Sequence, residues 1–193
     1  MMGRSHLVLA GAAYAALYVR PIETPYGTLA APMLGGFTPD PNFALLVSFA
    51  IAVACGLAPD IDKRGSWASR SLGLPTRWLS WGIEHSFGHR GGFHSLVGLA
   101  GAYLLGELLG ATLGVTGLGA VVAFGWAVHL LTDAWTKNGV PVLWPLHPAR
   151  LRLPPWMTTG TMLEAVMLVL TLVALAAYAL APIVAQRVLL PNL

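Results

Sequence analysis

His129 and Asp133 stand four residues apart in an otherwise apolar stretch, and both are residue types that bind metal ions. A spacing of four places two side chains on one face of a helix, one turn apart. Leaving two ionisable groups without partners inside a lipid-compatible helix costs several kcal/mol. A bound cation removes that cost, so we expect a metal site here. The alternative is a hydrogen-bonded pair that joins two helices.

Further candidate ligands lie at the ends of other apolar segments. Each has a simpler explanation when taken alone, such as a Pro-Asp helix stop, an interfacial histidine or an acid at a helix N-terminus. Their convergence at one membrane face is the stronger argument, and Gly91-Gly92 gives the backbone the freedom to bring two histidines together. The candidates are His6, Asp60, Asp62, His89, His94 and Glu164.

The composition predicts an integral membrane protein with a single domain, residues 1–193. Hydrophobic residues make up 56% of the chain and charged residues 10%, whereas soluble domains have about 25% charged residues. Mean hydropathy is +0.68. The lone Cys55 excludes an internal disulfide. The basic pI of 9.4 is explained by residues beside the membrane, so no nucleic-acid partner is expected.

Five apolar segments predict an all-α bundle of about five transmembrane helices. A short amphipathic helix after Pro75, within residues 76–87, is expected to lie in the membrane interface. With the N-terminus in the cytoplasm, only Arg20 and Arg187 of the 11 basic residues lie outside, as the positive-inside rule predicts. The site is then expected at the cytoplasmic face of the inner membrane. The segments are Leu7–Val19, Phe43–Ala58, His94–Thr116, Leu118–Trp135 and Ala165–Ala185.

The ordered motifs resemble the LexA-regulated, YdjM-type family of predicted membrane-bound metal-dependent hydrolases. These motifs are Pro59-Asp-Ile-Asp62, Phe87-Gly-His-Arg-Gly-x-x-His-Ser95, His129-Leu-x-x-Asp133 and Gly139-Val-Pro-x-Leu-Trp-Pro145. The order of ligands is also similar, more distantly, to that of zinc-dependent phospholipases C. These resemblances imply one or two divalent transition-metal ions held by His6, Asp60, Asp62, His94, His129, Asp133 and Glu164.

Zinc is the first expectation for the metal, with manganese and iron as alternatives, because the ligands are imidazoles and carboxylates without thiolate. The expected reaction is hydrolysis of a phosphoester by metal-activated water, with a membrane lipid as a partner or carrier of the substrate. Asp60 is the candidate base and His89 a second catalytic candidate. Arg90, Arg150 and Arg152 are candidates for binding the phosphate. A metal or ion transporter and a metal-stapled structural protein are the alternatives.

Overall fold

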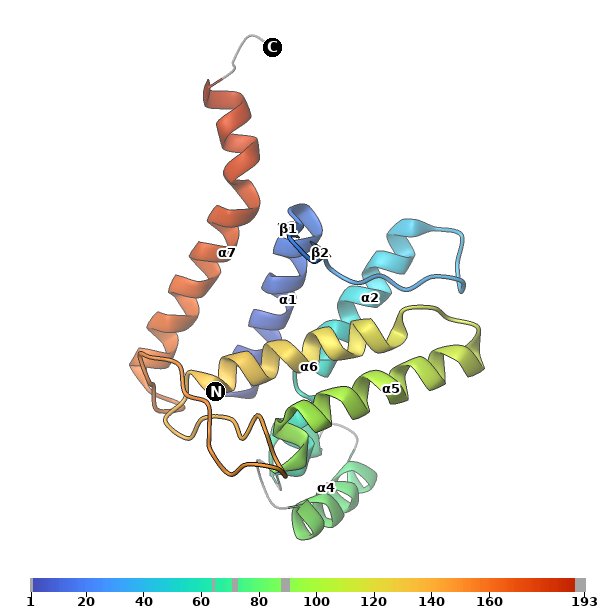
Figure 1. Cartoon of the computed structure of the whole chain (residues 1–193), viewed down its shortest axis with the longest axis vertical. Helices are drawn as coiled ribbons and strands as arrows, with labels where there is room; N and C mark the ends of the chain where they lie inside the picture. Colours follow the sequence, from blue (N-terminus) through green and yellow to red (C-terminus); the bar gives the residue numbers. More distant parts are fainter. Residues whose placement is uncertain (1, 64, 71–72, 88–90, 190–193) are drawn as a thin grey trace.

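The computed structural model describes residues 2–63, 65–70, 73–87 and 91–189, and this part of the chain is mostly helical (Figure 1). Short 3-10 helices η1 (Ala58–Asp62) and η2 (Gly92–His94) follow α2 and precede α5. The α-helices are α1 (Gly3–Val19), α2 (Pro41–Cys55), α3 (Trp67–Arg70), α4 (Leu74–Phe87), α5 (Leu96–Leu113), α6 (Leu118–Ala134) and α7 (Met162–Leu189).

The expectation of an all-α protein needs one correction. Strands β1 (Ile22–Thr24) and β2 (Gly27–Leu29) pair antiparallel in an exposed hairpin between α1 and α2. The tight turn is possible because Gly27 adopts a φ of 127°, which a residue with a side chain rarely adopts. The hairpin carries none of the candidate ligands.

Three helical segments of the described chain are long and apolar enough to cross a membrane: Pro41–Asp62, Leu96–Leu113 and Met162–Pro182. α6 is also apolar but has 17 residues, as does α1. At 1.5 Å per residue, each of these two helices reaches about 26 Å, slightly less than the roughly 30 Å hydrocarbon core. Crossing by α1 and α6 therefore stays a prediction.

Glycines allow the helices around the site to approach closely. A methyl group at Gly106 would lie 2.6 Å from Cα of Gly119, so these residues permit close packing of α5 against α6. A methyl group at Gly125 would overlap the Ala52 carbonyl oxygen, so α6 and α2 are also close. This second approach brings the end of α2 to the part of α6 that carries His129.

α4 presents large apolar side chains outward. Trp78 is 73% exposed and Trp81 is 52% exposed, and Leu74 and Arg77 lie with them along one hollow of the surface. α4 packs against α3 and η1, below the ends of the larger helices (Figure 1). An apolar face of this kind is suited to the membrane interface. The interfacial position of α4 stays a prediction.

The orientation of the bundle can be tested with two exposed loop positions. In a Cys55→Ser background, Tyr26→Cys in the hairpin should react with a membrane-impermeant thiol reagent in spheroplasts, because the charge distribution places the hairpin outside. Leu146→Cys, between α6 and α7, should react only after permeabilisation. Both native side chains are highly exposed, at 99% and 90%. The reverse labelling pattern would place the candidate site on the outer face.

Candidate metal centre

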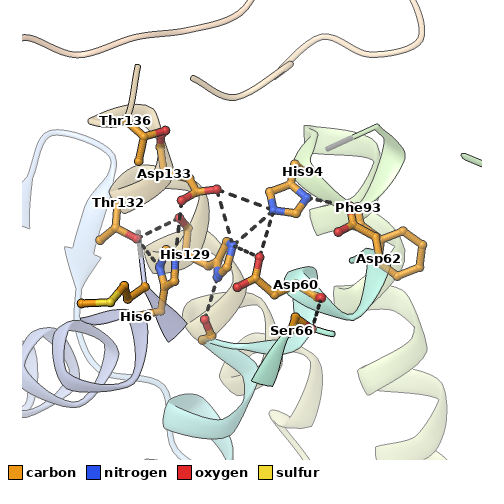
Figure 2. Close-up of polar contacts among 12 residues, drawn as sticks. His6, Asp60, Asp62, Ser66, Phe93, His94, His129, Thr132, Asp133 and Thr136 are labelled. Carbon is orange, nitrogen blue, oxygen red and sulfur yellow. Dashed lines mark hydrogen bonds and ion pairs between the residues drawn. The ribbon is translucent and has the colours of Figure 1, made fainter. Parts of the chain in front are cut away.

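Five side chains from four separate elements converge at one end of the bundle (Figure 2). His94 Nε2 lies 3.3 Å from His129 Nε2, and Asp60 Oδ1 lies 3.8 Å from each of them. Asp133 Oδ2 lies 3.7 Å from His94 Nε2 and 3.9 Å from His129 Nε2, while its Oδ1 lies 3.4 Å from His6 Nε2. We call these residues the His/Asp cluster: His6, Asp60, His94, His129 and Asp133.

The positions of these residues follow from where the helices end. His6 is in the first turns of α1, and the last turns of α6 carry His129 and Asp133. Asp60 is in η1, which continues directly from α2, and His94 ends η2, just before α5 begins. The rings of His6 and His129 stack with centroids 3.8 Å apart. The predicted i, i+4 pair and the predicted convergence of the helix ends are both seen.

Hydrogen bonds at Nδ1 set the tautomers of two of the histidines. His129 Nδ1 lies 2.7 Å from the Gly56 carbonyl oxygen, which can only accept, so this nitrogen carries the proton. His6 Nδ1 lies 2.7 Å from Thr132 Oγ1, whose own proton is donated to the His129 carbonyl at 2.9 Å. Thr132 therefore accepts from His6. In the tautomer with the proton on Nδ1, the Nε2 atom of each ring presents its lone pair to the cluster.

Asp62 orients the third ring in the same way. Its Oδ2 lies 3.0 Å from His94 Nδ1, so the carboxylate accepts a hydrogen bond from Nδ1–H, and the His94 Nε2 lone pair is directed into the cluster. Two imidazole lone pairs that face each other at 3.3 Å repel, and two carboxylates add negative charge beside them. A cation between these donors removes the repulsion. The donor set therefore fits a metal ion.

The donor atoms divide into two overlapping groups. One consists of His6, Asp60 and His129, the other of His94, His129 and Asp133, and within each group the atoms lie within 4.8 Å of one another. Because both groups contain His129, the arrangement is compatible with one ion or with two neighbouring ions. Imidazole and carboxylate ligands suit zinc, manganese or iron, in agreement with the expected cofactor.

Two predicted ligands have other positions. Asp62 contacts the far nitrogen of the His94 ring and is in neither donor group. Glu164 is also in neither group: its Oε1 accepts from Met2 N and Ser5 Oγ, and its Oε2 accepts from Gly160 N, at 2.7 to 2.8 Å. Glu164 thus joins the start of α1 to the start of α7. Its expected role as a ligand to a second metal stays a prediction.

Of the candidate phosphate-binding and second catalytic residues, the described part of the chain contains Arg150 and Arg152 alone. Arg150 and Arg152 are exposed on the loop after α6, where Arg150 donates to the Asn138 carbonyl at 3.4 Å and the stem of Arg152 lies against Gly139. His89 and Arg90 lie outside the described residues. Among the described residues, the contacts of Arg150 and Arg152 are with their own loop and not with the cluster.

Sequence reasoning missed the groups that hold the rings in place. Thr132 follows His129 by three residues, which is the spacing at which a helical threonine hydroxyl reaches the carbonyl one turn back, and this signal could have been used. The Gly56 carbonyl could not be found in this way, because a backbone group has no residue signature.

Asp60 gives the cluster its contact with the surroundings. The side chain of Asp60 is 17% exposed, whereas those of His6, His94 and His129 are 0% exposed and that of Asp133 is 1% exposed. A substrate or water molecule that reaches the cluster therefore meets the η1 carboxylate first.

The fold and the cluster define a mostly helical membrane protein with a buried His/Asp group that could hold a metal ion. The family described as YdjM inner membrane protein matches residues 1–189, and the chain belongs to this family.

Curated relatives from two kinds of bacteria match part of the chain. Inner membrane protein YdjM of Escherichia coli (strain K12) is 38% identical over 106 residues, which cover 53% of this chain and 51% of that protein. Uncharacterized protein YvsG of Bacillus subtilis (strain 168) is 33% identical over 112 residues, 58% of this chain and 65% of that protein. The chain thus spans about half the length of the Escherichia coli relative that it matches. No solved structure matches.

Proposed function

We propose that this protein is a membrane-bound, metal-dependent hydrolase that acts on a phosphoester. The observation that carries the proposal is the set of three imidazoles whose Nδ1 contacts all turn the Nε2 lone pair toward the same two carboxylates. Imidazole nitrogens and carboxylate oxygens gathered at these distances form a donor set that suits a divalent transition-metal ion. They are the ligands of a cation.

The roles of the side chains follow from their contacts. His6, His94, His129 and Asp133 would hold the metal, since their donor atoms face one another at 3.3 to 3.9 Å. A bound divalent ion would supply Lewis acidity, which polarises an ester and makes water a stronger acid. Asp60 Oδ1, at the exposed side, would take the proton from the attacking water. Asp62, Thr132 and the Gly56 carbonyl keep the three rings in the required tautomer.

One observation favours a second candidate, a metal-stapled structural protein. If Asp60 is also a ligand, the donor atoms come from α1, η1, η2 and α6, and a bound ion would join four elements of the chain. A structural site has all its positions filled by protein groups, whereas a catalytic site keeps one position open. The partial exposure of Asp60 favours the catalytic site.

A transporter is less well supported by the polar residues. A transporter would need polar groups that continue across the bilayer. Glu107, within α5, is a polar residue away from the cluster, and its Oε1 accepts a hydrogen bond from Gly119 N at 3.0 Å. This contact satisfies a backbone group at the start of α6 and gives Glu107 a structural role. We further propose that the site faces the cytoplasm, from the positive charge that flanks it.

The proposed function can be tested with the purified protein in lipid vesicles. Hydrolysis of bis(p-nitrophenyl) phosphate should be lost after treatment with a chelator and should return when zinc, manganese or iron(II) is added back, since the reaction depends on the metal. A screen of phosphomonoesters and phosphodiesters would then narrow the substrate. A protein that holds stoichiometric metal but hydrolyses no phosphoester would favour the structural alternative.

A further inference from the structure

An apolar groove runs along the outer side of α5 and α6. It has a volume of about 480 Å³ and is bounded at one end by Phe93, Trp126 and Trp144. Further along, its floor consists of small residues of α5, among them Gly101, Ala102 and Gly106. α5 is one of the three segments suited to cross a membrane, so this groove opens toward the hydrocarbon of the bilayer.

The aromatic end of the groove is formed by residues that are close in sequence to members of the His/Asp cluster. Phe93 directly precedes His94, and Trp126 precedes His129 by one helical turn. Trp126 Nε1 donates to the Phe93 carbonyl at 2.9 Å, and the two rings stack with centroids 5.9 Å apart. Ala58, at the start of the η1 helix that carries Asp60, packs in the same apolar cluster as these rings. The groove therefore ends at the same level of the bundle as the cluster.

The length of the groove matches one leaflet of a membrane. Its lining on α5 runs from Val97 to Leu109, and 12 residues of α-helix rise about 18 Å. One leaflet contributes about half of the roughly 30 Å hydrocarbon core, or about 15 Å. A lipid chain that lies in the groove would thus end with its polar group near the metal ligands. A neighbouring helix that packed in the groove would not bring a phosphate group to the metal ligands.

We propose that the groove holds one acyl chain of a membrane phospholipid, and that the phosphoester of this lipid is presented to the His/Asp cluster. The proposal rests on the proposed function and adds the substrate class: the phosphoester belongs to a membrane-resident lipid. The groove would select long-chain substrates, because a soluble phosphoester gains nothing from an apolar groove in the bilayer.

Gly101 offers a way to fill the groove. A Cβ at this position would meet no atom within 4 Å, so a large side chain can occupy the groove without displacing the protein. Ala100 is the adjacent exposed residue of α5 and does not line the groove, which makes it a matched control. The test therefore compares Gly101→Trp with Ala100→Trp, both as the full chain.

The first measurement is retention of lipid. The proteins are expressed, reconstituted in vesicles of phosphatidylethanolamine and phosphatidylglycerol, extracted in detergent and weighed by native mass spectrometry. Wild type and Ala100→Trp should keep one phospholipid, and Gly101→Trp should lose it. Equal retention by the two variants overturns the proposal. The proposal is also overturned if the wild type is a dimer and Gly101→Trp is a monomer, because the groove is then an interface between two copies of the chain.

The second measurement separates this proposal from the proposed function. Gly101→Trp should lower hydrolysis of phosphatidylglycerol by roughly tenfold or more and leave hydrolysis of bis(p-nitrophenyl) phosphate at the level of Ala100→Trp. If Gly101→Trp lowers the hydrolysis of both substrates equally, the proposed role of the groove is wrong, and the proposed hydrolase activity is unaffected. If wild type retains the lipid but hydrolyses neither substrate, the hydrolase is wrong and the lipid-binding groove stands.

Discussion

Replacing His129 by alanine is expected to remove the bound metal from the purified protein. His129 belongs to both donor groups, and its Nε2 lies within 3.9 Å of His94, Asp60 and Asp133. No other member of the cluster is shared in this way, so its loss should affect every ion in the site. The measurement is the metal content per protein after identical purification, by elemental analysis.

Two further variants make this result specific. His147→Ala changes an exposed histidine on the loop after α6 and should leave the metal content at the wild-type level. Asp62→Asn should keep metal but weaken its binding by about 10- to 100-fold, as is typical when a residue that orients a ligand is changed. If His129→Ala folds and holds as much metal as His147→Ala, the cluster is a hydrogen-bonded group and not a metal centre.

Changing Asp60 to asparagine is expected to abolish most of the hydrolysis. Asp60 is the exposed carboxylate of the cluster, and an amide at this position cannot accept the proton of an attacking water. We expect a loss of about 10²- to 10⁴-fold in kcat, the usual contribution of a general base. The measurement is the steady-state rate on the phosphoester that the wild type hydrolyses, with metal content determined on the same sample.

Glu107→Gln is the matched control for this change. It is the same carboxyl-to-amide change at a residue of α5, and the amide oxygen can still accept the hydrogen bond from Gly119 N. Its rate should stay near that of the wild type. Full activity in Asp60→Asn would show that Asp60 is not the general base. Loss of activity in Glu107→Gln alone would bring the transport alternative forward.

The positions of the helix ends made much of the site predictable from the sequence. Apolar stretches mark where helices begin and end, and His6, Asp60 and His94 stand at such ends, while His129 and Asp133 share a helix face by spacing alone. The structure confirms that these five side chains meet. Their meeting could be predicted because helices of similar length that pack side by side align their ends.

The division of work between Asp60 and Asp62 could not be predicted. Both residues lie in η1, a 3-10 helix with three residues per turn, so side chains two positions apart point in different directions. Which one faces the cluster depends on how η1 continues from α2. The structural role of Glu164 was also hidden, because its partners Ser5 and Gly160 are a long way from each other along the chain.

The metal centre itself is tested most directly by X-ray absorption spectroscopy of the wild-type protein, at the edge of whichever metal elemental analysis finds. We expect a first shell of nitrogen and oxygen only, with the multiple-scattering signature of imidazole from the histidines of the cluster, and loss of that signature in His129→Ala. A protein purified without chelator that contains no transition metal, or a metal with sulfur ligands, would contradict this centre.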